Sequence, residues 1–323
     1  MNTDNDLTKR KVIVAYHANC LDGFTAAWVT TRALGAADCV CTLQEMEYTE
    51  LSYHTLAAKV KELEPSLLYI VDFSVPLEFL SNLKRHCPKT ITTILDHHKT
   101  AFENYVPHIE VTPDAYVTTN RHRARIVLDN AHSGAGLCWK YLMREAADSP
   151  LVAYVEDYDL WRFAFGDETK WVNKYLIDIP KTLGNWDILA EEFSDPKILI
   201  EILAKGEKLQ EEHDREVRYI ASKAKLISIT GLEGLYIECP DKTLVSDVGH
   251  ALAEKCGTFG AMTYKVEGGI REWSLRGVDA FDVSALAKVF GGGGHKGAAG
   301  FRAELDDSRI VYMETGVIGE ESE

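Results

Sequence analysis

The chain has 323 residues, enough for two domains with cores of their own, and its 46% hydrophobic and 26% charged residues are ordinary for a globular protein. Its formal net charge of −15 excludes non-specific binding of long nucleic acids, which depends on many Lys and Arg contacts to phosphate. The apolar runs are too short for a membrane span of about 20 residues, and residues 1–11 lack the apolar core of a signal peptide, so we expect a soluble, cytoplasmic protein with no membrane partner.

The first half of the chain alternates short β-rich runs with helical segments. This rhythm is typical of a mostly parallel sheet with helices on both faces, and therefore of an α/β fold. The predicted strands are 11–16, 38–43, 67–73 and 90–95, and the predicted helices are 23–34, 50–63 and 76–86.

The middle of the chain, residues 133–193, has a mainly helical pattern, and Ser133 is placed to cap the first helix. A long charged helix over 197–223 follows, with a narrow apolar stripe. Such a helix usually spans between domains, although an ordinary surface helix is nearly as consistent with the periodicity.

The last third of the chain returns to short strands and helices. Strands are predicted at 226–229, 235–238, 259–266 and 271–276, and helices at 244–255 and 283–290. This pattern predicts a second, smaller α/β domain. The expected organisation is a first α/β domain over 1–195, a connecting helix over 196–224, a second α/β domain over 225–310 and a frayed tail over 311–323.

Acidic and histidine side chains follow three of the predicted strands of the first half, at the point where each strand ends. A later helical segment carries further acids. The residues are His17, Asp22, Asp72, Asp96, His97, His98, Asp157 and Asp159. Because ligands bind outside the carboxyl ends of the strands in open α/β sheets, we expect these side chains to converge on one site.

The chemistry of this set suits divalent cations. Carboxylates with imidazoles favour manganese, magnesium, iron or zinc, and the absence of a thiolate cluster argues against a purely structural zinc site. A single Asp at a strand end is more often a helix cap, and a single His is more often a hydrogen-bonded loop residue. The joint pattern, with adjacent His97 and His98 directly after Asp96, is not explained by packing and predicts a metal site.

Four segments of the first half resemble, as a set and in order, the motifs of the DHH phosphoesterase superfamily. They are 16–24 (YHANCLDGF), 71–74 (VDFS), 94–100 (ILDHHKT) and 155–161 (VEDYDLW). The set is specific, whereas the Asp-His-His triplet alone would not be. The resemblance implies a metal-dependent phosphoesterase with a DHH domain, in which two ions share a bridging carboxylate, activate a water and clamp a phosphoryl group.

The resemblance also implies the metal ligands. His17 would bind one metal, Asp22 and His97 would bind the other, and Asp72 would bridge the two. Asp157 would supply the remaining carboxylate. Manganese is the expected metal, with magnesium, iron and zinc as alternatives.

Two further residues of the Asp-His-His motif would act beside the metals. Asp96 would orient a histidine from outside the ligand set, and His98 would meet the phosphate. Asp159 is a rival for the role of Asp157, because the sequence does not fix the register of that segment.

The first motif departs from the commoner family pattern, which carries two aspartates. Cys20 stands where the first aspartate is expected, and Asp22 stands alone. Cys20 is either a soft metal ligand or a small buried residue, and the second interpretation is slightly favoured. The chain's seven cysteines form no CxxC pair, which favours reduced thiols.

A glycine-rich segment near the C-terminus, 291–300 (GGGGHKGAAG), resembles the substrate-binding motif of the domain that accompanies DHH in nucleases and oligonucleotide-cleaving enzymes. Glycines let backbone N–H groups approach an anion or base closely, and we favour this over a flexible loop. The resemblance implies substrate contacts by Gly292, Gly293, Gly294 and His295. Arg276 resembles a phosphate-contacting position, with a surface salt bridge as an equally weighted alternative.

The glycine segment favours one branch of the superfamily, because the inorganic pyrophosphatases have a different second domain. We therefore expect hydrolysis of very short oligonucleotides or dinucleotides to mononucleotides. The alternatives are hydrolysis of cyclic dinucleotides or of another small phosphoester or phosphoanhydride, and a catalytically degenerate nucleotide-binding protein. A homodimer is compatible with the sequence.

Overall fold

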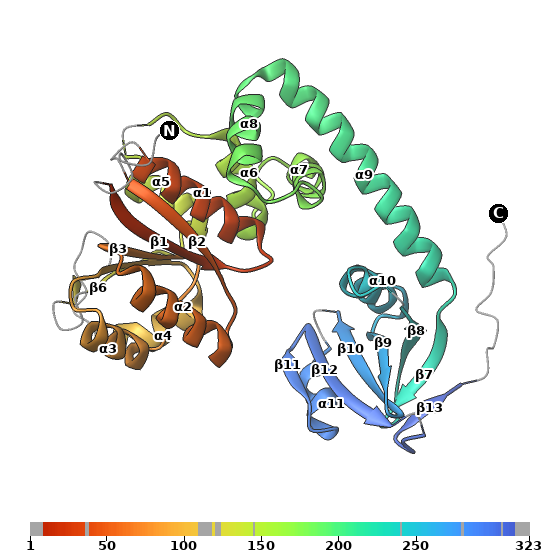
Figure 1. Ribbon diagram of the computed structural model, residues 1–323. Coiled ribbons are helices and arrows are strands. Elements are labelled where there is room, and N and C mark those ends of the chain that lie inside the picture. The colour runs from red at the N-terminus through yellow and green to blue at the C-terminus, as the bar shows by residue number, and fades with distance from the viewer. Residues whose placement is uncertain are drawn as a thin grey trace. The chain divides into compact units, whose positions relative to one another are not determined.

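The computed structural model describes residues 9–35, 39–108, 118–119, 124–144, 146–239, 241–278, 281–304 and 306–313. The chain divides into two compact units, residues 1–210 and 211–323, with the boundary inside the long helix α9 (Pro196–Ser222) (Figure 1). Residues 1–8 and the part of the expected tail after residue 313 lie outside the described residues.

The first unit is built on a six-stranded sheet with the order β2-β1-β3-β4-β6-β5. Its strands pair in parallel except for the short edge strand β5, which pairs antiparallel with β6. The strands are β1 (Arg10–His17), β2 (Cys39–Met46), β3 (Leu67–Val71), β4 (Ile91–Asp96), β5 (Thr118–Thr119) and β6 (Ala124–Leu128). The predicted α/β fold with a mostly parallel sheet is confirmed.

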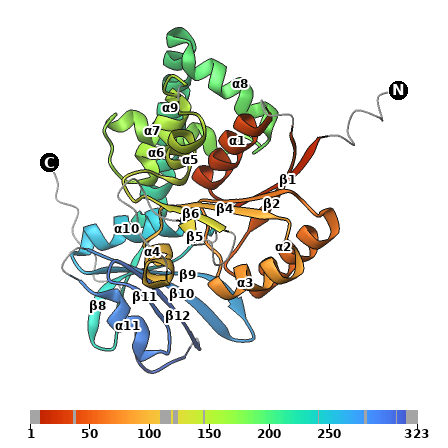
Figure 2. The same cartoon turned by 90° about the vertical axis from the view of Figure 1, so that its left-hand side faces the viewer.

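Helices cover both faces of this sheet, because alternate residues of each strand point to opposite sides. Val12 and Val14 of β1 belong to one core, whereas Ile13 and Ala15 belong to the other. Figure 2 shows α1 and the helices α5 to α8 on one face, and α2 and α3 on the other. The helices of this unit are α1 (Leu21–Gly35), α2 (Glu50–Leu63), α3 (Leu77–His86), α4 (Lys99–Tyr105), the 3₁₀ turn η1 (Val106–His108), α5 (Gly134–Leu142), α6 (Pro150–Asp159), α7 (Asp167–Ile177) and α8 (Leu183–Ser194).

The second unit is a seven-stranded sheet with the order β11-β12-β10-β9-β8-β7-β13, in which only β8 and β9 pair in parallel among the described strands. One core lies under α10 and includes Val217 and Ala221 from the end of α9, and the other lies under α11. Its elements are β7 (Lys225–Ile229), β8 (Leu232–Glu238), α10 (Val245–Cys256), β9 (Phe259–Glu267), β10 (Ile270–Gly277), α11 (Val283–Val289), β11 (Gly293–His295), β12 (Ala298–Glu304) and β13 (Ile310–Tyr312).

None of the helices in the described ranges is both long enough and apolar enough to span a bilayer. This agrees with the short apolar runs of the sequence.

Candidate metal centre

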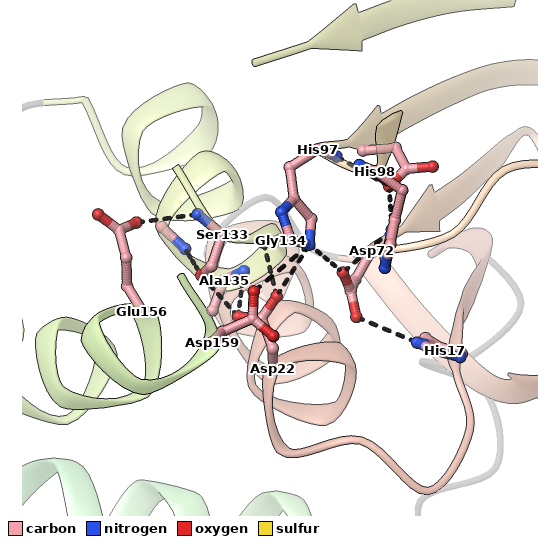
Figure 3. Close-up of polar contacts among 12 residues, drawn as sticks. His17, Asp22, Asp72, His97, His98, Ser133, Gly134, Ala135, Glu156 and Asp159 are labelled. Atoms are coloured by element: carbon pink, nitrogen blue, oxygen red, sulfur yellow. Dashed lines mark hydrogen bonds and ion pairs between the residues drawn. The ribbon is translucent and has the colours of Figure 1, made fainter. Parts of the chain in front are cut away.

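Four of the five expected metal ligands, His17, Asp22, Asp72 and His97, gather at the carboxyl edge of the sheet of the first unit (Figure 3). The strands β1, β3 and β4 are parallel neighbours, so their ends lie side by side. His17 is the last residue of β1, Asp72 directly follows β3, and His97 directly follows β4. Asp22 comes from the first turn of α1, and Asp159 comes from the last turn of α6.

Asp72 is the central carboxylate of this cluster. Its side chain is 1% exposed, and its backbone has φ +53°, a left-handed conformation that Asp and Asn adopt more readily than most residues. Its Oδ1 lies 3.0 Å from His97 Nε2, while its Oδ2 lies 3.6 Å from His17 Nδ1. The two oxygens therefore face different histidines, which is the arrangement that a bridging carboxylate requires.

Asp22 is held by the N-terminus of α5. Its two oxygens accept hydrogen bonds from Ser133 Oγ at 2.6 Å, Gly134 N at 2.6 Å and Ala135 N at 2.9 Å. These donors and the helix dipole favour a negative charge at this end of α5. Asp22 Oδ2 lies 3.8 Å from His97 Nε2. Burial, with Asp72 and Asp159 nearby, raises the pKa of Asp22 in the metal-free protein.

The sequence predicts Ser133 as a helix cap, and the structure shows it accepting a hydrogen bond from Gly136 N at 3.3 Å. Its contact with Asp22 was not predicted, nor was the role of Gly134. A Cβ atom at position 134 would lie 2.4 Å from Asp72 Cβ and 2.8 Å from Asp22 Oδ2. Only glycine at position 134 lets α5 approach both carboxylates. The sequence feature that could have predicted this role is a glycine directly after the capping residue Ser133.

Asp96 is fully buried and acts on the two histidines that follow it. Its Oδ1 accepts hydrogen bonds from His97 N at 2.8 Å and His98 N at 3.1 Å, and lies 2.7 Å from His98 Nδ1. Its other oxygen accepts a hydrogen bond from Ser74 Oγ. Asp96 therefore orients His98, which is the role expected of a residue that supports the metal ligands without binding the metal. The hydrogen bond between Asp96 and His98 raises the pKa of His98.

Asp157 lies away from this cluster, and Asp159 lies in it. Asp157 Oδ1 accepts a hydrogen bond from Ala164 N at 2.9 Å, and its Oδ2 accepts hydrogen bonds from Phe165 N at 3.3 Å and from Thr169 Oγ1. Asp159 Oδ2 instead lies 3.5 Å from His97 Nε2. Residues two apart on a helix point about 200° apart, so only one of the two acids can face the cluster. We therefore replace Asp157 with Asp159 in the expected ligand set.

Potential ligand atoms approach one another closely in three groups: His17 with Cys20 and Asp72; Asp72 with His97 and His98; and Asp22 with His97 and Asp159. Three buried atoms of these groups have no hydrogen-bond partner within the described ranges, namely His17 Nδ1, Asp72 Oδ2 and Asp159 Oδ2. Buried polar atoms are rarely left without a partner. Unpartnered carboxylate and imidazole atoms that face each other fit divalent cations.

The metal-free cluster retains protons that a cation would displace. Burial lowers the pKa of His97, but the hydrogen bond to Asp72 and the charge of Asp22 outweigh it and raise that pKa to about 9. Burial likewise opposes ionisation of Asp72, yet contacts with His17 and His97 lower its pKa to about 2. At neutral pH the metal-free site therefore pairs an ionised Asp72 with a protonated His97.

Metal binding is accordingly expected to release protons at pH 7 and to weaken as the pH falls from about 9. A histidine coordinates a metal through a deprotonated nitrogen, so protons compete with the cation at His97. Isothermal titration of the metal-free protein with manganese in two buffers of different ionisation enthalpy measures the protons released. Equal apparent enthalpies in both buffers would contradict the protonated state of His97.

A pocket of about 240 Å³ opens beside the cluster within the first unit. Cys20, Asp22 and Asp159 form part of its wall. Apolar side chains of α6 and α7 line much of it, with Asn173 and Lys181 as polar groups. The pocket offers space for a small molecule next to the candidate metal-binding residues.

The glycine-rich segment of the second unit is a hairpin. Gly293, Gly294 and His295 pair antiparallel with β12. Gly294 has φ +142°, and a Cβ atom at Gly292 would lie 2.2 Å from Gly300 O, so these two positions require glycine. The side chain of His295 is exposed.

Arg276 is half-buried on β10 of the second unit. Its guanidinium donates to Ser246 Oγ at 3.3 Å, Ser274 Oγ at 3.0 Å and Leu275 O at 2.9 Å, and burial lowers its pKa. No carboxylate of the described residues lies within ion-pair distance of it. The nearby charge of Asp247 opposes the effect of burial on the pKa of Arg276, and the phosphate contact of Arg276 stays a prediction.

Comparisons with known proteins give distant similarities. No protein-family profile matches the chain. It is 24% identical over 300 residues to the uncharacterized protein R106 of Acanthamoeba polyphaga mimivirus, an alignment that covers 89% of this chain but 66% of that relative's length.

Solved structures are also similar at low sequence identity. RecJ in complex with Mn²⁺ from Thermus thermophilus gives a TM-score of 0.48 at 15% identity, over 94% of this chain and 50% of RecJ. PggH, a pGpG-specific phosphodiesterase from Vibrio cholerae, gives 0.49 at 12%, over 93% of this chain and 95% of PggH. These values are too low to assign a family, so the family remains an inference from the motifs.

Proposed function

We propose that the chain is a metal-dependent phosphoesterase of the DHH type that hydrolyses very short oligonucleotides or dinucleotides to mononucleotides. The observation that carries the proposal is Asp72, a buried carboxylate whose Oδ1 faces His97 and whose unpartnered Oδ2 faces His17. The motifs that resemble the DHH superfamily contribute every residue of this cluster.

The cluster offers two metal positions that share Asp72. His17 would hold a cation on one side, and Asp22, His97 and Asp159 would hold one on the other. When bound, two divalent cations supply positive charge to the phosphoryl group and lower the pKa of a water molecule. Manganese is the proposed metal on the basis of the motifs.

The chain's own residues perform the remaining tasks. Asp96 fixes the orientation of His98, whose side chain is 32% exposed and so remains accessible to a phosphate. Ser133 and the backbone N–H groups of α5 hold Asp22 in place. A buried, rigidly bonded set of this kind positions charge before the substrate arrives, which is what electrostatic catalysis requires.

Incubation of the purified chain with manganese and a panel of substrates tests the proposal. The panel contains a linear dinucleotide, a short linear RNA, a cyclic dinucleotide and pyrophosphate. Release of mononucleotides from the two linear substrates supports the proposal, whereas turnover of only the cyclic dinucleotide or pyrophosphate favours the corresponding alternative. No turnover, combined with no bound metal, would favour the alternative of a catalytically degenerate nucleotide-binding protein.

Replacing Arg276 with alanine is expected to raise KM for a linear dinucleotide about 10- to 100-fold, with a smaller effect on kcat. A hydrogen bond to a charged group contributes about 1.5–3 kcal/mol, which corresponds to this range. Arg302→Ala is the matched control, because Arg302 is 72% exposed and forms an ion pair with Glu272 in the same sheet. Equal KM values for the two variants would remove Arg276 from the substrate site.

A further inference from the structure

Cys20 lies in the short connection between β1 and α1, beside the metal position of His17. One ligand atom from each of His17, Cys20 and Asp72 falls within 4.8 Å of the others. A sulfur atom, an imidazole nitrogen and a carboxylate oxygen therefore face a common point. Of the two interpretations of Cys20 that the sequence leaves open, this geometry favours the metal ligand over the buried packing residue.

The two partners of Cys20 have unused ligand atoms. Asp72 Oδ2 and His17 Nδ1 are buried and make no hydrogen bond in the described part of the chain. Asp72 is itself 1% exposed, so water does not supply the missing partner freely. The two atoms are 3.6 Å apart and thus too distant to satisfy each other by a hydrogen bond. These unpartnered atoms belong to two of the three residues whose ligand atoms approach one another at this position.

Packing does not account for a cysteine at this position. Cys138 shows what a core cysteine looks like in this protein, because it is fully buried within the core that includes α1 and α5. Cys20 belongs to none of the hydrophobic clusters of the described residues and lies instead in the wall of the pocket beside Asp22 and Asp159. Cys20 is a free cysteine and is partly exposed.

We infer that Cys20 is a thiolate ligand of the cation held by His17 and Asp72, and that this position selects a thiophilic metal such as zinc, iron(II) or cobalt(II). On binding, a metal–sulfur bond forms and the thiol proton passes to solvent, so no oxidant or reductant is needed. Thiolate ligands select zinc and iron over magnesium and manganese, which prefer oxygen. The inference rests on the metal site of the proposed function and changes the metal expected at one of its two positions.

Cobalt(II) titration of the metal-free, full-length chain tests the inference without any assay of hydrolysis. A thiolate bound to cobalt gives a sulfur-to-metal charge-transfer band in the near ultraviolet, whereas oxygen and nitrogen ligands alone do not. The wild type is expected to show the band, and Cys20→Ser is expected to bind cobalt without it. Cys87→Ser is the matched control, because Cys87 is a partly exposed thiol at the end of α3 and its variant is expected to retain the band.

A second variant tests the selectivity. Cys20→Asp replaces sulfur with oxygen and is expected to raise the affinity for manganese relative to zinc at least about tenfold, by the ligand preferences of these metals. Circular dichroism compares the fold of each variant with that of the wild type.

The outcomes separate the inference from the proposed function. Cobalt binding to the wild type without the charge-transfer band, or a band that persists in Cys20→Ser, overturns the role of Cys20 and leaves the metal site standing. Absence of cobalt binding to the wild type overturns both.

Discussion

Replacement of Asp72 by asparagine is expected to abolish hydrolysis and to release at least one of the two metals. Asp72 is the one carboxylate of the described residues whose oxygens face both histidines, His17 and His97, so its loss affects both metal positions. Changes in residues that only support a ligand typically reduce metal affinity or activity 10- to 100-fold, so a shared ligand should cost more than about 100-fold in kcat. Activity is measured on a linear dinucleotide, and metal content by elemental analysis.

Asparagine is the informative substitution at this position. It preserves the shape of the side chain and tolerates the backbone φ of +53°, whereas alanine would add backbone strain to the loss of charge. The variant is therefore expected to fold, as circular dichroism would show. Arg276→Ala provides the comparison, because it should retain far more turnover. An Asp72→Asn enzyme with near-normal kcat would exclude the bridging role and with it the proposed mechanism.

The sheet and its ligand edge follow directly from the sequence, because both depend on local patterns. The apolar run 11–16 predicts a buried strand, and β1 covers Arg10–His17. Parallel strands share one carboxyl edge, so His17, Asp72 and His97 were expected on the same edge. They lie close together because β1, β3 and β4 are neighbours in the sheet, an order that the sequence does not predict.

Other features depend on contacts that join distant segments and leave little local signal. The strand β6 and the helix α4 were not predicted, because each is short and carries few repeats of its periodic pattern. Glu156 accepts hydrogen bonds from Ser133 N at 3.3 Å and Arg162 Nη1 at 3.2 Å, which links α6 to the start of α5. No spacing in the sequence indicates this contact. The choice between Asp157 and Asp159 likewise depends on the rotation of α6, which tertiary packing sets.

Two substitutions on α6 are expected to separate these acids by opposite effects. Asp159→Asn should reduce metal affinity about 10- to 100-fold. The free energy of unfolding of the metal-free protein should stay unchanged or rise slightly. Burial raises the pKa of Asp159, with Asp72 contributing, so loss of its charge removes an unfavourable term at neutral pH. Asp157→Asn should instead lower the free energy of unfolding by about 1–3 kcal/mol, because an NH₂ group in place of one carboxylate oxygen cannot accept the hydrogen bonds that this oxygen accepts.

Metal titration and urea unfolding of the metal-free protein are applied to both variants. The four results together distinguish a metal ligand from a structural carboxylate. A ligand affects affinity without destabilising the metal-free protein, whereas a structural carboxylate lowers stability first and affinity only through the fold. Asp157 is 4% exposed and fixes the turn that follows α6, so its effect should be visible in urea before any metal is added. Loss of metal binding in Asp157→Asn at unchanged stability would return Asp157 to the ligand set and contradict the orientation of α6.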